Sequence, residues 1–315
     1  MSKMKLKCPV SSLRAAKIQI KFGATELYLG LASNDFSNLS YGGRGKTTWD
    51  GKHCTTSYEE IKEIVALAHE NNVRVSYTAN MPILYQDIIP GYLKYVEQGV
   101  DAGVDSLILG SIESIILLNK YKYPVDYISS VFTEAYNTEF LKWLEEMNIS
   151  EAYLPHHMKL DELKTMAEAT KIELGVFGHF GCSNSNGTCF LYHESGENIN
   201  VGLPCRAIYN GYVSGEFIGK QNFLDAATDC SVCSIQDLYD AGVKTIKIVG
   251  RGKSIEMIGA LTKIYRMAID NIGSEVQPEQ VREKAIQMME ILKTENCSLK
   301  RCKYGMDTPV LRAFV

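Results

Sequence analysis

Short apolar segments rich in β-branched residues alternate along the chain with segments whose apolar residues recur every three or four positions. The first pattern predicts buried strands and the second predicts amphipathic helices. Strands are expected at residues 5–10, 26–29, 73–78, 106–109, 127–131, 151–154, 172–177 and 245–249. Helices are expected from Ser11 or Ser12 and at residues 58–71, 89–102, 112–120, 138–147, 160–170, 235–240, 255–272 and 278–293. This alternation predicts an α/β fold, a (β/α)8 TIM-like barrel rather than a doubly wound sheet.

Two long segments interrupt the alternation. Residues 30–56 follow the second expected strand, and a cysteine-rich insertion, residues 178–235, follows the seventh. Loops at the carboxyl ends of barrel strands carry the chemistry of this fold, so both segments are expected at one mouth. We therefore expect a barrel domain at residues 1–275 that includes the insertion, and a C-terminal helix and tail at residues 276–315.

The composition is typical of a soluble globular protein. The 315 residues are 45% hydrophobic and 22% charged, and the formal net charge is -4 with a pI near 5.9. Since this balance leaves no general basic surface for a phosphate backbone, it disfavours nucleic acid as a partner. The sequence has no apolar run long enough for a membrane span or a signal peptide, which predicts a cytoplasmic protein without membrane contact.

The cysteines are unevenly distributed, with five of the nine between Cys182 and Cys233. A reducing cytoplasm and an odd count argue against a full set of disulfides, so metal binding becomes the leading hypothesis. Cys189, Cys205 and Cys230 complete the group, and only Cys230 and Cys233 form a C-x2-C pair. Single cysteines at wide spacing favour an iron–sulfur cluster over a structural zinc ion, which usually takes two close pairs. Reduced thiols acting as small apolar residues are the alternative.

Two segments around these cysteines resemble the peptidase U32 family. Residues 173–189, ELGVFGHFGCSNSNGTC, are similar to the family signature in which a strand leads to C-x4-G-x-C. Residues 230–254 contain a cysteine followed by AGVKTIKIVGRGKS, which is similar to the family's AGV and KIEGR motifs. The resemblance extends over about residues 5–272. Departures at Gly175 and Val249 indicate a divergent member.

The resemblance implies a 4Fe-4S cluster on Cys182, Cys189, Cys205 and Cys230, with Cys233 as the alternative fourth ligand. It also implies oxygen-independent hydroxylation, because members of the family support hydroxylation of ubiquinone precursors or RNA bases. We expect an iron–sulfur enzyme that hydroxylates a small anionic or aromatic molecule or performs a related redox-linked group transfer. RNA base hydroxylation, peptide hydrolysis and a non-catalytic subunit of a heteromeric complex are the alternatives, and a homodimer or heterodimer stays open.

Six further residues lie where a barrel places catalytic groups, at strand ends or in the loop after the second strand. They are His179, His156, His157, Lys247, Arg251 and Arg44. Histidine exchanges protons near neutral pH, and arginine binds a carboxylate or phosphate with two parallel hydrogen bonds. We expect Arg251, joined by Arg44 when its loop closes, to hold an organic anion; structural roles are the alternative for each residue. Isolated cysteines are usually inert, so Cys8 and Cys54 are expected to be inert thiols, with a substitute cluster ligand or a redox thiol as the alternative. Cys297 and Cys302 form a C-x4-C pair without a third partner in the sequence, and a second metal site there is the less favoured interpretation.

Overall fold

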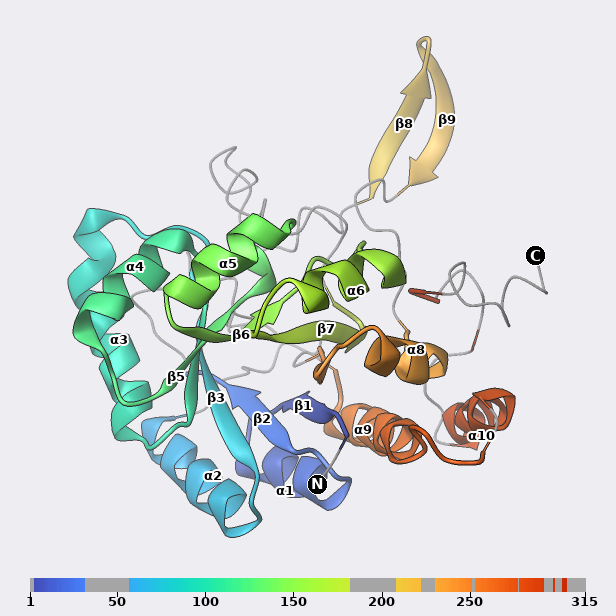
Figure 1. The fold of residues 1–315 in the computed structure, drawn as a ribbon, viewed down its shortest axis with the longest axis horizontal. Helices are drawn as coiled ribbons and strands as arrows, with labels where there is room; N and C mark the ends of the chain where they lie inside the picture. Colours follow the sequence, from blue (N-terminus) through green and yellow to red (C-terminus); the bar gives the residue numbers. More distant parts are fainter. Residues whose placement is uncertain are drawn as a thin grey trace.

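A computed structural model describes residues 3–31, 57–181, 208–221, 230–250, 253–276, 278–291, 297 and 302–304. Within these residues, parallel strands close into a barrel in the order β1-β10-β7-β6-β5-β4-β3-β2 (Figure 1). The barrel strands are β1 (Lys5–Pro9), β2 (Glu26–Leu29), β3 (Arg74–Ala79), β4 (Ser106–Leu109), β5 (Asp126–Ser129), β6 (Ile149–Tyr153), β7 (Glu173–His179) and β10 (Thr245–Ile248). The expected (β/α)8 barrel is confirmed.

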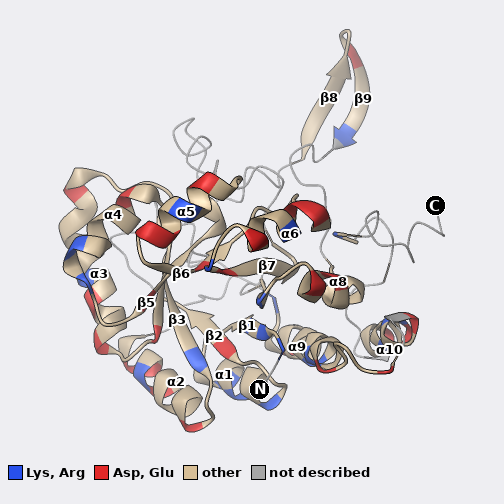
Figure 2. Cartoon of the chain, in the orientation of Figure 1, with Lys and Arg blue, Asp and Glu red and all other residues tan. Residues whose placement is uncertain are grey.

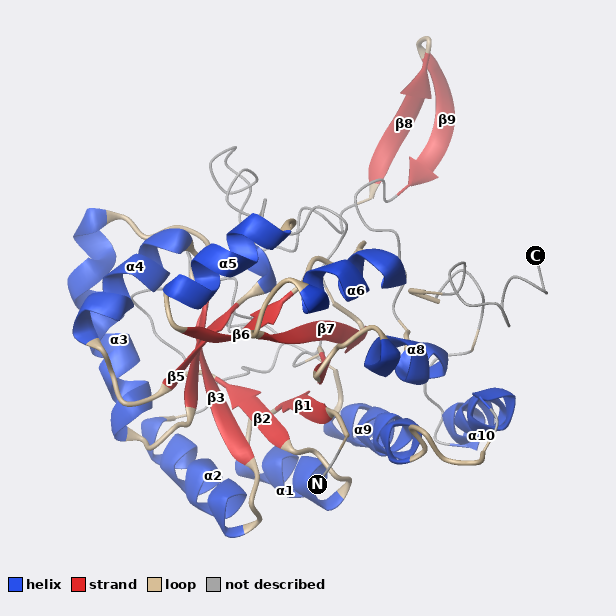
Figure 3. Ribbon diagram, viewed as in Figure 1, coloured by secondary structure: helices blue, strands red, loops and turns tan. Residues whose placement is uncertain are grey.

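Helices surround the barrel (Figure 3). They are α1 (Leu13–Lys21), α2 (Tyr58–Glu70), η1 (Gln86–Ile88), α3 (Ile89–Asp101), α4 (Ile112–Tyr121), η2 (Val131–Thr133), α5 (Thr138–Glu146), α6 (Leu160–Glu168), η4 (Val232–Ser234), α8 (Ile235–Asp240), α9 (Ile255–Asp270) and α10 (Pro278–Ile291). Ser12, Ser57 and Ser254 begin α1, α2 and α9 by accepting a backbone N–H through the side chain. None of the helices within the described ranges combines the length and the apolar character that a membrane crossing requires.

The apolar side chains form two cores. The larger core lies between the strands and the helices, and it extends to α10, which packs on α9 and buries Ala285 and Met289. The smaller core fills the barrel interior with Tyr28, Tyr153 and Phe177 among its members. Pleated strands direct alternate side chains to these two cores, which explains why their sequences are almost continuously apolar.

The fifth strand ends earlier than the sequence predicts. The expected strand at residues 127–131 was wrong at its carboxyl end, because β5 stops at Ser129 and the chain turns into η2. Ser130 begins this turn by accepting the backbone N–H of Phe132 at 3.3 Å. Val131 belongs to the barrel-interior core. Its β-branched, buried side chain therefore resembles a strand residue in the sequence although its backbone is helical.

A hairpin inside the cysteine-rich insertion was not expected. Strands β8 (Tyr209–Val213) and β9 (Glu216–Gln221) pair antiparallel and project away from the barrel (Figure 1). Ser214 and Gly215 join them with φ values of 51° and 86°. Two consecutive residues with positive φ are typical of the tight turn that matches the twist of a hairpin.

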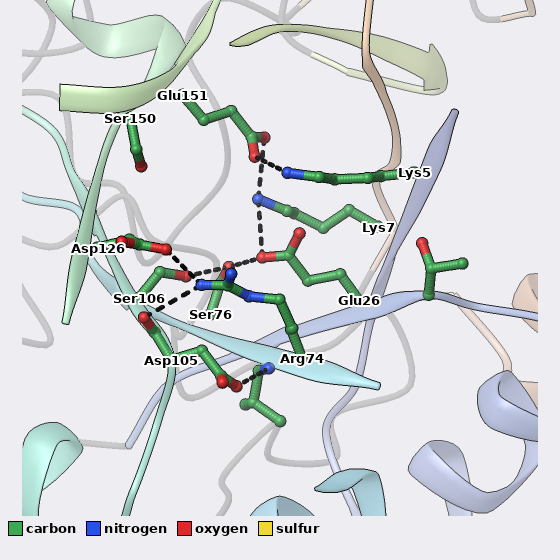
Figure 4. A network of polar contacts seen from close by, with 12 residues as sticks. Lys5, Lys7, Glu26, Arg74, Ser76, Asp105, Ser106, Asp126, Ser150 and Glu151 are labelled. Atoms are coloured by element: carbon green, nitrogen blue, oxygen red, sulfur yellow. Dashed lines mark hydrogen bonds and ion pairs between the residues drawn. The ribbon is translucent and has the colours of Figure 1, made fainter. Parts of the chain in front are cut away.

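Buried charges occupy the amino-terminal half of the barrel interior (Figure 4). The Lys7 ammonium on β1 lies 3.1 Å from the Glu26 carboxylate and 3.0 Å from that of Glu151, and Lys7 is fully buried. Ser76 donates a hydrogen bond to Glu26. Burial opposes ionisation of Glu151, but Lys7 and Lys5 hold the pKa of its carboxyl below the ordinary value. This end of a TIM barrel serves stability rather than chemistry, so the network is structural.

Candidate active site at the barrel mouth

The carboxyl ends of β7 and β10 and the return of the insertion lie together. His179 ends β7 and forms an isolated antiparallel bridge with Cys230, where the described chain resumes after the insertion. The His179 ring is buried and packs edge-on against Phe180, with the ring centroids 4.6 Å apart. The two ends of the long insertion are therefore joined at the mouth of the barrel, beside a proposed catalytic histidine and a proposed cluster ligand.

Tyr265 of α9 connects these residues. Its hydroxyl lies 3.3 Å from His179 Nδ1, donates to the carbonyl of Gly178 and lies 3.9 Å from Cys230 Sγ. The same oxygen accepts the backbone N–H of Ser231 at 3.0 Å. Burial raises the pKa of Tyr265 well above its usual range, so the hydroxyl stays protonated and can donate. A side chain at Gly178 would clash with Ile246 and the Tyr265 ring, which explains the glycine at this position.

The C-terminal segment also reaches the site. Cys302 forms a parallel backbone bridge with Cys230, and the Lys303 backbone N–H donates to the Cys230 carbonyl at 2.9 Å. The Lys303 ammonium donates to the carbonyl of Phe177. Burial, together with the neighbouring thiols of Cys230 and Cys302, raises the pKa of Cys233 to about 12. In the sequence Cys302 has Cys297 nearby at C-x4-C spacing, whereas the fold brings the backbone of residue 302 beside Cys230.

The proposed cluster is represented by one ligand within the described residues. Cys230 is partly buried at the mouth, and burial raises the pKa of its thiol to about 11. Its thiol is the ligand type that iron–sulfur clusters take, so this position fits the expected group. Cys182, Cys189 and Cys205 lie outside the described residues. The described ranges contain no group of three potential ligands placed to hold a metal ion, and the 4Fe-4S cluster stays a prediction.

The two histidines after β6 take different positions. His156 is buried, its ring centroid lies 6.4 Å from that of Phe177, and a Cβ at Gly181 would lie 2.9 Å from its Nδ1. Gly181 has a φ of 140°, so the chain passes close to His156 as it leaves β7. His157 is exposed and its ring lies 5.7 Å from that of Tyr136. Of the pair, His156 is the residue that the fold brings to the start of the insertion.

Lys247 points into the barrel. Its ammonium lies 4.4 Å from the ring centroid of Tyr28, 4.6 Å from that of Tyr153 and 5.9 Å from that of Phe177. Aromatic faces attract a cation, and the attraction is larger where water is excluded. The residue is 8% exposed. An outward orientation of Lys247 is therefore wrong, whereas its role in catalysis stays a prediction. Arg251 and Arg44 lie outside the described residues.

Glu134 is a mouth residue that the sequence does not single out. It follows η2 at the carboxyl end of β5 and has a left-handed backbone with φ of 56°. Burial raises the pKa of its carboxyl above the ordinary value. The same left-handed conformation ends α4 at Lys122, so at Glu134 it marks the end of a helical turn. The short turn that brings Glu134 to the mouth is not reported by the apolar pattern of the sequence.

Comparison with known proteins places these features in a family. Residues 11–304 match the family model of peptidase family U32. The chain is 24% identical over 280 residues to 23S rRNA 5-hydroxycytidine C2501 synthase of Escherichia coli, covering 87% of this chain and 40% of that protein. It is 24% identical over 281 residues to tRNA hydroxylation protein P1 of Bacillus subtilis, covering 85% of this chain and 63% of that protein. The chain thus spans less than two thirds of these relatives.

Other similar proteins have protease names, among them an uncharacterized protease of Methanocaldococcus jannaschii and a collagenase of Porphyromonas gingivalis. Among solved structures, the U32 peptidase Mk0906 superimposes with a TM-score of 0.52 at 10% identity. The superposition covers 79% of this chain and 94% of that one. At this identity the likeness concerns the fold alone.

Proposed function

Because this chain belongs to peptidase family U32, we propose that it takes part in the hydroxylation of an RNA base. The observation that carries the proposal is the similarity to two proteins named for rRNA and tRNA hydroxylation, which extends over 87% and 85% of this chain. The expectation of a small anionic substrate, which disfavoured nucleic acid as a partner, gives way to this alternative. A modestly acidic total charge does not prevent a local RNA-binding surface.

The proposed cofactor is a 4Fe-4S cluster on Cys182, Cys189, Cys205 and Cys230, whose bound form would supply the redox chemistry. The described residues support a role for Cys230 at the mouth. Tyr265 fixes the position of Cys230 relative to β7 through its contacts with Gly178 and Ser231.

Lys247 supplies a positive charge in the barrel interior below the mouth. The rings of Tyr28 and Tyr153 are buried, and their faces pack against the ammonium rather than opening to a ligand. The charge at this position can attract the negative charge of a nucleotide. The same cation favours the second candidate function, which is hydroxylation of a small aromatic anion.

Nucleoside analysis of cells with and without this chain tests the proposal. We expect rRNA or tRNA from a deletion strain to lack one nucleoside that carries an additional oxygen atom, and the wild-type chain to restore it. Cys230→Ser should not restore it, whereas Cys233→Ser is the matched control and should. An unchanged set of hydroxylated nucleosides after deletion contradicts the RNA proposal. Loss of a hydroxylated small metabolite instead would support the second candidate.

A further inference from the structure

The β8–β9 hairpin exposes an unusual amount of apolar surface. Half of the exposed large hydrophobic side chains among the described residues lie within residues 208–218. Tyr212 is 62% exposed and Phe217 is 56% exposed. A two-stranded hairpin is marginally stable on its own, and exposed apolar groups of this density mark interaction sites. The hairpin is therefore expected to contact another molecule.

The strand register separates two faces of the hairpin. Tyr212 pairs with Phe217, and Asn210 pairs with Lys220, so these four side chains share one face, which we call the aromatic face. The register shift at Gly211 introduces an extra residue in β9, which returns Lys220 to the side of Phe217. The ring centroids of Tyr212 and Phe217 lie 5.6 Å apart.

The opposite face differs in chemistry. Val213 pairs with Glu216 there, and Tyr209, which is 36% exposed, lies on the same face of β8. This face therefore carries one ring that is less exposed, together with the carboxylate of the hairpin. Glu216 and Lys220 are the charged residues of the hairpin (Figure 2). The aromatic face thus combines two exposed rings, one amide and one ammonium, without a carboxylate. This combination suits a ligand that has flat rings and negative charge.

We propose that the aromatic face binds unpaired bases of RNA, an inference that rests on the proposed function. Tyr212 and Phe217 provide ring faces on which bases stack, Lys220 attracts a phosphate, and Asn210 can hydrogen-bond to a base edge. Single-stranded RNA is recognised by such stacking, because the bases of a duplex are already stacked and its major groove is too narrow to read.

Two observations favour RNA over a protein partner or a second copy of this chain. Strands of five and six residues offer fewer contacts than the roughly 20–30 residues that a stable protein interface uses on each side. Stacking on bases needs only one or two rings. In addition, only eight residues separate the end of β9 from Cys230 at the barrel mouth. At about 3.4 Å per residue, this connection keeps the base of the hairpin within roughly 30 Å of the proposed reaction site, so an RNA strand bound to the hairpin can reach that site.

Binding of a fluorescein-labelled single-stranded RNA of mixed sequence to the full chain tests this inference by fluorescence anisotropy. We expect the double variant Tyr212→Leu, Phe217→Leu to bind at least tenfold more weakly. Leucine keeps an apolar contact between the strands but provides no stacking surface, so hairpin packing alone would leave binding unchanged. Val213→Ala, on the opposite face, is the matched control and should bind as the wild type does.

The salt dependence gives a second readout. Lys220→Ala should reduce the slope of log affinity against log salt concentration by about 0.7, the value for one phosphate contact on a single strand. If the wild type binds the RNA and the double leucine variant binds equally well, the hairpin inference is wrong while the proposed function stands. If the wild type does not bind the RNA, the hairpin inference is wrong, and the nucleoside analysis decides the proposed function separately. Light scattering tests the remaining alternative. If the wild type is a dimer and the double leucine variant is a monomer, the aromatic face binds a second copy of this chain, and the RNA inference is wrong.

Discussion

Replacing Lys7 with methionine should destabilise the barrel strongly. The substitution keeps an unbranched side chain that is one atom shorter and removes the positive charge, which lies 3.1 Å from Glu26 and 3.0 Å from Glu151. Glu26 and Glu151 are almost completely buried. The variant therefore leaves two carboxylates in the barrel interior without their common cation.

The magnitude follows from the geometry. At about 3 Å and an effective dielectric constant of about 20, each attraction is about 5 kcal/mol, and desolvation of the three charges offsets much of the total. Removal of one partner from a buried ion pair costs about 3–5 kcal/mol, because the remaining charge stays uncompensated. We expect the free energy of unfolding to fall by that amount, which is a large fraction of the total stability of a domain.

Urea denaturation followed by circular dichroism measures this loss. Glu173→Gln is the matched control, because it removes a carboxylate that pairs with Lys5 at a half-exposed position. Exposed pairs contribute about 0–1 kcal/mol. A Lys7→Met variant that loses no more than the control would refute the conclusion that this network holds the barrel together.

The pH dependence gives an independent check. The pKa of Glu151 is lowered in the folded chain, so its contribution to stability is present above its ordinary value of 4.5 and is lost as the pH falls through the folded pKa. In the variant the buried Glu151 carboxyl loses its nearest cation and takes up a proton more readily as the pH falls. The difference in unfolding free energy between wild type and variant should therefore shrink as the pH falls from about 7 towards 4. A constant difference would contradict the ionic explanation.

Three further predictions concern the mouth and the thiols. Anaerobically reconstituted Cys230→Ser should lack the roughly four irons per chain of a 4Fe-4S cluster, whereas Cys233→Ser should retain them in an iron assay. The opposite result would identify Cys233 as the fourth ligand. Gly178→Ala should lower the unfolding free energy by about 1–3 kcal/mol in thermal denaturation, because its methyl group has no room beside the barrel wall. Burial raises the pKa of Cys8 to about 12, so a thiol reagent at pH 8 should modify the exposed Cys297 and leave Cys8 intact until the chain unfolds. Rapid labelling of Cys8 in the folded chain, detected by peptide mass spectrometry, would count against that burial.

The sequence predicts the barrel well because each strand and helix is recognised from the spacing of apolar residues within its own segment. Apolar periodicity located every barrel strand within a few residues, and it failed at Val131, whose side chain is buried like that of a strand residue. The hairpin was missed because glycines and polar residues interrupt its alternation, as in Tyr209–Val213. The hairpin is exposed to solvent on both faces, so its strands do not need the alternation of apolar and polar residues that burial of one face requires.

The site is predicted less completely, because its contacts join distant parts of the chain. The family motifs identify Cys230, and the position of Lys247 at a strand end places it near the mouth. No local pattern reports that Tyr265 connects His179 to Cys230, or that the backbone of Lys303 is bonded to Cys230. These contacts depend on tertiary packing, which spacing alone does not encode.

The contact between Cys302 and Cys230 has a consequence for the order of events during synthesis. The ribosome releases the chain from its amino end, so the barrel strands and the tyrosine of α9 are available before residues 302–304 have emerged. The hydrogen bonds from Lys303 to the carbonyls of Cys230 and Phe177 cannot form until then. This side of the mouth therefore forms after the barrel strands and α9, once residues 302–304 have left the ribosome.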